Sequence, residues 1–355
     1  MSQFKLKPSQ IKTEVINCFQ SGVVPFVQSS PGLGKSAIMR MIAEHYNLEL
    51  IDVRLSQCAP EDLMGLPMKI EVNGKIMATF AAFEMFPTED TPLPAGKDGW
   101  LLFFDELNSA SKSVQAASYK PLLDHMMGMY RLHPQLRIAA AGNLDTDNAI
   151  VNTMSTATQS RMAHFEMAFD FDEFITFAEA DDWDSRIIGF LYFMPGLAHK
   201  FDPDHQDRTF PCPRTWEFAS NMIKGTKSED IPPYRLAAVV GDGAAVEAYS
   251  FLKEFSKLPS YGDIVSDPTG TPVPQNPATK YALISMLLEK GMNEDFFQVT
   301  PYVERMDPEF QAVFIRGTVR RFPALRRDPD FTRNSRKLMR HILNDPSFAD
   351  NTVAA

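Results

Sequence analysis

Residues 23–36 decide the fold of this chain, and they read Val-Val-Pro-Phe-Val-Gln-Ser-Ser-Pro-Gly-Leu-Gly-Lys-Ser. The apolar run at 23–27 predicts a buried strand, with Pro25 near its start because proline cannot donate a ladder hydrogen bond. From Lys35 to Tyr46 the apolar residues recur at helical spacing. A glycine-containing loop between a strand and a helix is the context in which a phosphate-binding motif is meaningful.

The loop itself has the chemistry to hold a phosphate group. Its glycines let backbone N–H groups point at an anion, and the following helix adds the positive end of its dipole. We expect Lys35 to reach the β- and γ-phosphates of ATP and the Ser36 hydroxyl to ligate Mg²⁺. The strict pattern has glycine where this chain has Ser29, and a Pro-Gly turn that happens to precede Lys-Ser is the alternative. The expected nucleotide-binding residues are Ser30, Pro31, Gly32, Leu33, Gly34, Lys35 and Ser36.

Further apolar runs predict that the first strand belongs to a doubly wound parallel sheet. They alternate with amphipathic segments, as parallel strands alternate with crossover helices. The run at 100–104 is almost wholly apolar, which is typical of a strand covered on both faces. The four further strands are expected at 48–53, 100–104, 136–141 and 164–169.

Polar residues follow two of these runs. Asp105 and Glu106 end the run at 100–104, and Asn143 follows the run at 136–141. The carboxyl ends of parallel strands are where open α/β sheets bind ligands. There Asp105 would hold Mg²⁺ through water, Glu106 would act as general base, and Asn143 would contact the γ-phosphate and the attacking water. Taken alone, the acidic pair could be a solvated strand end and the asparagine a turn former.

Two arginines are candidates for stabilising the charge of a phosphoryl-transfer transition state. Arg161 stands just before the fifth expected strand, and Arg214 would open a helix of a second domain. Arginine suits this role because its charge is permanent and its guanidinium is a planar fork of donors. A surface ion pair is the alternative for either residue.

A long connection at 55–99 separates the second and third expected strands. Within it, residues 68–80 predict a β-hairpin around the turn Asn73-Gly74. A hairpin placed in a crossover is an insertion into the scaffold. It could contact a substrate or line a pore, or it could pack on its own domain, and both interpretations stay open.

The pattern becomes helical after residue 172. Five prolines fall between 258 and 277, which predicts a loop there. We expect an α/β core over 1–172, a helical domain over 173–300 and a basic helical extension over 301–355. The expected helices are 173–198, 213–224, 233–256, 278–290 and 308–321.

The charge of the chain is unevenly distributed. Its formal net charge is −10, which disfavours nucleic acid as a general partner. Nine basic and two acidic residues lie between Arg316 and Arg340, giving that segment a net charge of +7. The three cysteines are scattered without metal-ligand spacing, which fits a reducing cytosol, and we expect no signal peptide or membrane span.

The order of these motifs resembles the MoxR-type AAA+ ATPases, in the branch found in phages and bacteria. The resemblance covers roughly residues 10–290 and includes Asp105–Ala110 after the acidic strand and Glu61–Gly65 before the hairpin. This chain departs from the family at Ser29, at Ser109, where many members have arginine, and at Met162, where phenylalanine is usual.

The resemblance implies a fold, a reaction and an assembly. It implies a P-loop AAA+ core followed by a helical lid, with Asn143 as the sensor-1 residue and Arg214 as the sensor-2 arginine. It implies that Arg161 is an arginine finger that acts on the ATP of a neighbouring subunit. Members form hexameric rings that use ATP and Mg²⁺ to remodel or activate partner proteins, often one with a von Willebrand factor A domain. A cytoplasmic location is expected, in a bacterium or in the host of a phage.

Three functions remain in competition at this point. The acidic surface, the hairpin and the resemblance favour a chaperone-like ATPase that acts on protein. The basic segment at 316–340 favours a nucleic-acid motor or loader. A slow, nucleotide-gated scaffold is the third alternative, and the presence of Glu106 argues against it.

Overall fold

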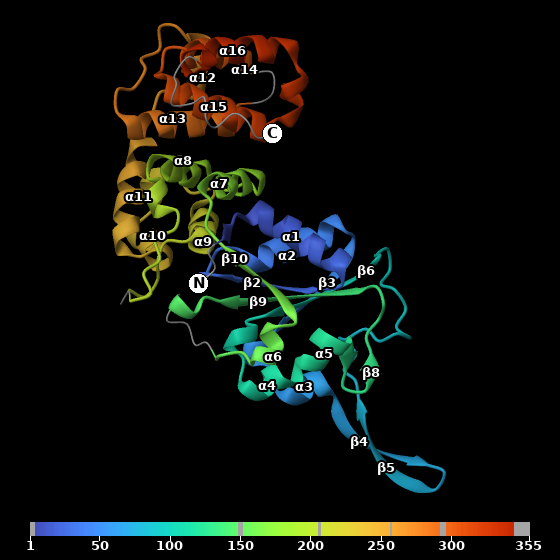
Figure 1. The fold of residues 1–355 in the computed structure, drawn as a ribbon. Helices are drawn as coiled ribbons and strands as arrows, with labels where there is room; N and C mark the ends of the chain where they lie inside the picture. Colours follow the sequence, from blue (N-terminus) through green and yellow to red (C-terminus); the bar gives the residue numbers. More distant parts are fainter. Residues whose placement is uncertain (1–3, 148–151, 205–206, 256–257, 292–295, 344–355) are drawn as a thin grey trace. The chain divides into compact units, whose positions relative to one another are not determined.

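Two compact units make up the chain in the computed structural model (Figure 1). The structure describes residues 4–147, 152–204, 207–255, 258–291 and 296–343. The first unit comprises Met1–Asp170 with Asp202–His205, and the second comprises Phe171–Phe201 with Gln206–Ala355.

A six-stranded parallel sheet forms the centre of the first unit, in the order β1-β10-β2-β9-β6-β3. Its strands are β1 (Lys5–Leu6), β2 (Val24–Ser29), β3 (Leu48–Arg54), β6 (Gly99–Asp105), β9 (Leu136–Asn143) and β10 (Met162–Met167). The doubly wound α/β fold and the five predicted strands are confirmed, with Pro25 as the second residue of β2. The short edge strand β1 was not predicted, and β10 begins two residues earlier than the expected strand at 164–169.

Helices cover both faces of this sheet (Figure 1). They are α1 (Pro8–Ser21), α2 (Lys35–His45), α3 (Pro60–Met64), α4 (Lys112–Ala117), α5 (Tyr119–Asp124) and α6 (Thr156–Gln159). Every residue of β6 is buried, as its apolar sequence predicts for a strand between two helical layers.

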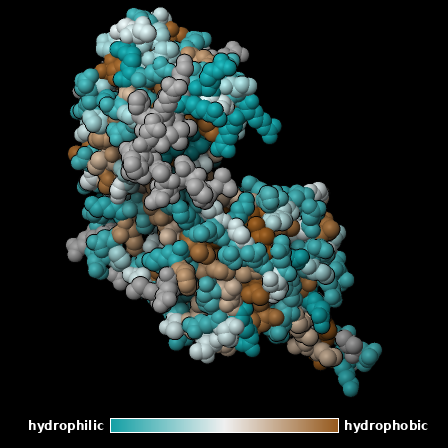
Figure 2. All heavy atoms as spheres, turned by 45° about the horizontal axis from the view of Figure 1, so that its top comes forward, coloured by the Kyte–Doolittle hydropathy of each residue, from teal (hydrophilic) through white to brown (hydrophobic). Residues whose placement is uncertain are grey.

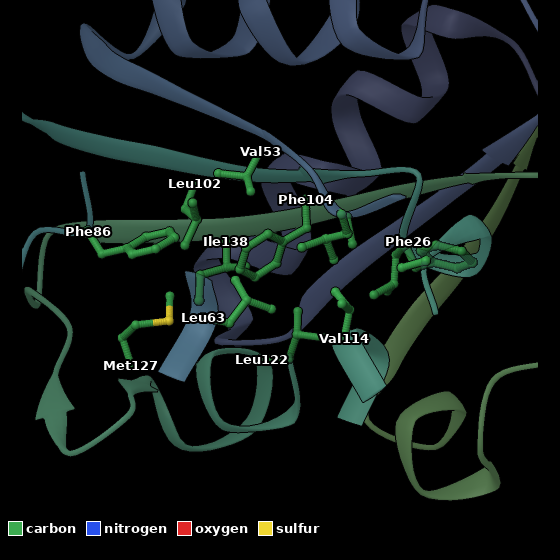
Figure 3. Close-up of a cluster of buried hydrophobic side chains, with 14 of the residues drawn as sticks. Phe26, Val53, Leu63, Phe86, Leu102, Phe104, Val114, Leu122, Met127 and Ile138 are labelled. Carbon is green, nitrogen blue, oxygen red and sulfur yellow. The ribbon is translucent and has the colours of Figure 1, made fainter. Parts of the chain in front are cut away.

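The side chains of successive β6 residues pack alternately against the two helical layers, because side chains alternate across a strand. Leu101 and Phe103 pack with residues of α1 and α2. Leu102 and Phe104 pack on the opposite side, in the cluster drawn in Figure 3. This anchoring fixes the end of β6, and therefore the position of the acidic pair.

The connections after β2 and β9 run in opposite directions. From β2 the chain passes through α2 to β3, and from β9 it passes through α6 to β10. Helices α2 and α6 cover opposite faces of the sheet (Figure 1). Because β2 and β9 are hydrogen-bonded neighbours, with Ser29 opposite Asn143, their carboxyl ends form the switch point at which open α/β sheets bind ligands.

The predicted hairpin is present between β3 and β6. It consists of β4 (Leu66–Val72) and β5 (Lys75–Ala81), joined by Asn73 and Gly74 with positive φ angles of 52° and 73°. The described side chains of β4 are all exposed, so this strand does not pack on its own domain. In Figure 2 the hairpin projects at the lower right, with hydrophobic side chains uncovered on it. They include Leu66, Met68, Ile70, Ile76, Met77 and Phe80. A second, minor hairpin joins β7 (Met126–Met127) to β8 (Tyr130–Arg131).

Helices make up the second unit. They are α7 (Phe171–Ala180), α8 (Ser185–Phe193), α9 (Pro213–Ile223), α10 (Pro233–Val240), α11 (Asp242–Phe255), α12 (Tyr261–Ser266), α13 (Pro277–Lys290), α14 (Phe296–Val303), α15 (Pro308–Arg321) and α16 (Pro329–Leu343). The segment expected at 233–256 is broken at Gly241, whose φ of 82° is costly for residues other than glycine.

Two further expectations for this unit need correction. The single helix expected at 173–198 is the pair α7 and α8, because Asp184 caps a new helix by accepting from the Arg186 N–H at 3.0 Å. The loop expected at 258–277 contains α12, which Ser260 caps by accepting from the Asp263 N–H at 3.1 Å. No helix among the described residues combines the length and apolar character that crossing a bilayer requires.

Candidate functional site

The glycine-containing loop has the backbone conformation that its sequence predicts. Gly32 and Gly34 have φ angles of 77° and 88°, which side chains disfavour. Helix α2 begins directly after Gly34, at Lys35. Since the first-turn N–H groups of a helix have no partner within the helix, the loop and the start of α2 together form a concentration of backbone donors.

The ammonium group of Lys35 lies among three oxygen acceptors. It donates to the carbonyl and the hydroxyl oxygens of Ser29, at 3.1 Å each, and to the Asn143 side-chain oxygen at 3.3 Å. Ser29 is fully buried in this position. The residue that departs from the strict motif therefore holds the lysine on which the motif depends.

Ser36 and Asp105 meet at the same end of the sheet. The Ser36 hydroxyl donates to Asp105 Oδ2 at 3.0 Å, across 69 positions of sequence. Hydroxyl and carboxylate oxygens are ligands that Mg²⁺ prefers, and Mg²⁺ in nucleotide sites takes few protein ligands beside the phosphates. The described residues contain no cluster of three or more His, Cys, Asp or Glu side chains suited to a metal. This pair of oxygens therefore fits Mg²⁺ accompanied by a nucleotide, whereas no site built from protein ligands alone is seen among them.

Glu106 adopts an unusual backbone conformation at the end of β6. Its φ and ψ of 57° and 33° lie in the left-handed region, which costs energy for a residue with a side chain. Its N–H donates to Asp105 Oδ1 at 2.9 Å, and the Ser56 hydroxyl donates to its carboxylate. The carboxylate is thus oriented from the loop after β3.

Negative charge accumulates at this corner of the sheet. Burial raises the pKa of Asp52 above its ordinary value, and the nearby charge of Asp105 raises it further. Arg54 and Arg40 act in the opposite direction. A cation bound beside Asp105 would relieve this repulsion.

Asn143 is held by its backbone as well as by its side chain. The Asn108 side chain donates to the Asn143 carbonyl at 2.7 Å and accepts from the Asn143 N–H at 3.1 Å. Gln28 also donates to that carbonyl, at 3.3 Å. The structure thus brings together Lys35, Ser36 and Asn143 with the acidic pair.

Arg161 lies apart from this group of residues. It precedes β10, whose first residue Met162 pairs with Val24 at the start of β2, whereas the phosphate loop follows the end of β2. Five residues of strand, or about 16 Å, separate the amino end of β2 from its carboxyl end. The Arg161 side chain is exposed and donates to the Ala157 carbonyl at 3.0 Å. It therefore does not reach the phosphate loop of its own chain.

Arg214 belongs to the helical unit. It is the second residue of α9, and its side chain is exposed. Cys212 caps this helix with its backbone N–H donating to Thr215 at 2.9 Å.

Two residues of the site, Ser56 and Asn108, were not predicted from the sequence. Nothing in the sequence around Ser56 indicates a contact with Glu106, because the contact joins two separate loops. Asn108 offered a weak signal, as a polar residue just after a buried strand.

No family model matches the sequence. Among solved structures, NtrX from Brucella abortus in complex with ATP is 12% identical, with a TM-score of 0.38, over 97% of this chain and 68% of that protein. The RuvB Holliday junction branch migration motor of Thermotoga maritima is 12% identical, with a TM-score of 0.32, over 88% of this chain and 75% of that protein. At similarities this low, the assignment of function depends on the residues of the chain itself.

Proposed function

We propose that this chain is a MoxR-like AAA+ ATPase that hydrolyses ATP with Mg²⁺ in a homo-oligomeric ring and remodels a partner protein. One observation supports the reaction most directly. The Lys35 ammonium, the Asn143 amide and the pair formed by Ser36 and Asp105 converge at the switch point of a parallel sheet. Convergence of a phosphate loop, an acidic strand end and a polar neighbour is the arrangement that phosphoryl transfer needs.

Binding of the nucleotide follows from the donors at the loop. The backbone N–H groups around Gly32 and Gly34 would surround the phosphates, and the N-terminus of α2 would add its positive dipole. Lys35 would exchange an acceptor on Ser29 or Asn143 for a phosphate oxygen. Ser36 and Asp105 would hold Mg²⁺, which neutralises charge on the phosphates when it is bound.

Hydrolysis would use the side chains at the ends of β6 and β9. Glu106 would take a proton from a water molecule, whose oxygen attacks the γ-phosphorus as the bond to the ADP oxygen breaks. Ser56 would keep the Glu106 carboxylate in position, and the Asn143 amide would orient the same water. Since these groups belong to different elements, the rigid sheet supplies their alignment.

The arginines that stabilise the transition state would come from a neighbouring subunit and from the helical unit. Arg161 is exposed and lies at the amino ends of the strands, away from the phosphate loop at their carboxyl ends. This position favours a role at the site of a neighbouring subunit. Arg214, exposed at the start of α9, would serve as the sensor-2 arginine of a helical lid. We infer a hexameric ring in the cytoplasm, with a von Willebrand factor A-domain protein as a partner.

A pull-down with a trapped variant tests this proposal. In Glu106→Gln, ATP binds but turns over slowly, so ring and partner complex should accumulate together on ATP and Mg²⁺. Lys35→Ala is the matched control, because it should fail to bind ATP and recover neither. Turnover that is equal in wild type and Glu106→Gln would contradict hydrolysis and support a nucleotide-gated scaffold.

Exposed arginines favour a nucleic-acid motor as the second candidate. Within 316–340, Arg320 is engaged with Glu179, but six other described arginines are exposed: Arg316, Arg321, Arg326, Arg327, Arg333 and Arg336. Salt-dependent binding to DNA that is lost when Arg326 and Arg327 become glutamate would favour this function. Absence of retention on DNA at low salt would exclude it.

A further inference from the structure

We propose that Asn108 is the positioning residue that aligns Asn143 with Glu106, by tying the end of β9 to the loop that follows β6. This inference rests on the proposed ATPase function and assigns the residue on which the alignment of that site depends. Glu106 and Asn143 stand on neighbouring strands, yet both must address one water molecule. The contact between the two strand ends therefore decides the geometry of the reaction.

The contact between Asn108 and Asn143 has two points. Asn108 Nδ2 donates to the Asn143 carbonyl at 2.7 Å, and Asn108 Oδ1 accepts from the Asn143 N–H at 3.1 Å. A side-chain amide thus continues the hydrogen-bonding pattern of a strand beyond the end of β6. Because both the donor and the acceptor of one peptide residue are engaged, Asn143 can neither rotate nor translate independently of the loop.

The approach of Asn108 to β9 also depends on its neighbour in that strand. A Cβ atom at Gly142 would overlap the side-chain oxygen of Asn108. Gly142 has no positive φ angle, so backbone strain does not call for glycine there. The absence of a side chain at Gly142 leaves room for the Asn108 amide.

Asn108 is itself fixed from other directions. Its carbonyl accepts from the Asn152 N–H at 2.6 Å, and the Asn152 side chain donates to the Ala110 carbonyl at 2.9 Å. Gln115 donates to the same Ala110 carbonyl at 3.1 Å and to the Asn152 carbonyl at 3.3 Å. Asn108 and Gln115 are 1% and 4% exposed, so their hydrogen bonds are shielded from water.

The same loop carries the unusual conformation of Glu106. The Ser109 and Ala110 N–H groups donate to the Glu106 carbonyl at 2.9 Å and 3.1 Å, closing a tight turn around a residue with φ of 57°. A strained residue persists only where its surroundings over-determine it. Asn108 lies inside this turn, so one side chain connects the turn of Glu106 to the backbone of Asn143.

Steady-state kinetics of single and double variants test this role. In Asn108→Ala, kcat should fall by about 10²-fold, as expected for a misplaced catalytic group, while KM for ATP changes by less than about threefold. The double variant Asn108→Ala/Asn143→Ala should be no slower than Asn143→Ala alone, because both substitutions remove the same positioned amide. Ser109→Ala, at the adjacent and partly exposed residue, is the control and should retain the wild-type kcat.

Hydrogen exchange provides a readout that is independent of activity. Exchange at the Asn143 amide should accelerate in Asn108→Ala and stay at the wild-type rate in Ser109→Ala, since only the first removes its acceptor. Should Asn108→Ala not fold, Asn108→Asp keeps an acceptor for the Asn143 N–H and loses the donor to its carbonyl. Its kcat should then fall with little change in exchange.

These measurements distinguish failure of the positioning role from failure of the proposed ATPase function. Wild-type kcat in Asn108→Ala, together with a slow Asn143→Ala, would overturn the positioning role and leave the ATPase intact. Losses that multiply in the double variant would also overturn it, because Asn108 would then act independently of Asn143. Absence of ATP turnover in the wild-type protein would overturn the proposed function itself, and the positioning role with it.

Discussion

Two polar clusters in this molecule differ in the contacts that their groups make. At the switch point of the first unit, Lys35, Ser36 and Asn143 remain partly exposed. Lys35 contacts Asn143, and Ser36 contacts Asp105. In the helical unit, Arg320 and Tyr192 both contact Glu179, at 3.3 Å and 3.0 Å. The groups of the first cluster can exchange these partners for a ligand, whereas Glu179 in the second is ion-paired with Arg320.

The cluster around Glu179 shows the cost of burying a charged group within the helical unit. The Glu179 and Arg320 side chains are 11% and 19% exposed. Burial raises the pKa of Glu179 above its ordinary value, although Arg320 acts to lower it. Burial is also the main cause that raises the pKa of Tyr192, followed by the charge of Glu179. Comparison of the clusters therefore predicts that substitutions in the first affect turnover and those in the second affect stability.

Glu106→Gln should have the largest effect of the substitutions considered. Loss of the general base should lower ATP turnover by about 10²- to 10⁴-fold, while thermal unfolding stays close to that of the wild type. Parallel measurements of phosphate release and of Tm check both halves of the expectation. A large drop in Tm would place Glu106 among the stabilising residues, as in the second cluster.

Arg320→Ala should show the opposite behaviour. Removing Arg320 takes away the ion-pair partner of the partly buried Glu179 and leaves only the weaker attraction of Arg316, so the free energy of unfolding should fall by about 3 kcal/mol. Denaturant unfolding followed by far-UV circular dichroism measures this loss. Arg326→Ala, at an exposed arginine of the same segment, is the matched control and should change stability by less than about 0.5 kcal/mol. Equal losses in both variants would contradict the distinction between an ion-paired, partly buried arginine and an exposed one.

A pH series sharpens the account of Glu179. Its pKa is raised above the ordinary value of 4.5 in the folded protein, so the folded state holds this proton more firmly than the unfolded state does. The unfolding free energy of the wild type, relative to Glu179→Gln, should therefore fall as the pH rises from about 4 to 7. A relative stability that rises over this interval would mean that attraction to Arg320 outweighs the cost of burial.

Ser29→Gly should have the smallest effect, and it acts on binding. The substitution removes the hydroxyl that competes with phosphate for the Lys35 ammonium, so affinity for ATP should increase about three- to tenfold. Titration with a fluorescent ATP analogue, compared with the wild type at equal Mg²⁺, measures the change. Weaker binding in Ser29→Gly would show that the serine orients the lysine for the nucleotide.

Local patterns in the sequence predicted the parts of the fold that depend on neighbouring residues. The glycines of the phosphate loop and the Asn73-Gly74 turn have the positive φ angles that their positions require. The apolar run at 100–104 predicted the fully buried strand β6. In each case the interactions that determine the local structure involve residues close together in the sequence, so the structure can be predicted from the sequence alone.

Features that depend on distant partners could not be predicted in this way. Strand β1 has two residues, and its register follows from pairing with β10. Asn108 resembles any polar residue in a loop until β9 comes within hydrogen-bonding distance. The convergence at Lys35, Asp105 and Asn143 was anticipated because all three follow strands of one parallel sheet. The contact from Ser56 was not, because it joins two loops.

A mixing experiment tests the central claim most directly, that each hydrolysis site requires two copies of the chain. Lys35→Ala cannot bind ATP at its own phosphate loop but can supply Arg161 to a neighbouring subunit. Arg161→Ala can bind ATP at its own loop but cannot supply the arginine. Each variant alone should be inactive, and an equimolar mixture should regain about a quarter of wild-type turnover, since random assembly pairs the intact halves at that frequency. A mixture that stays inactive although both variants assemble, or full turnover by Arg161→Ala alone, would contradict the shared site.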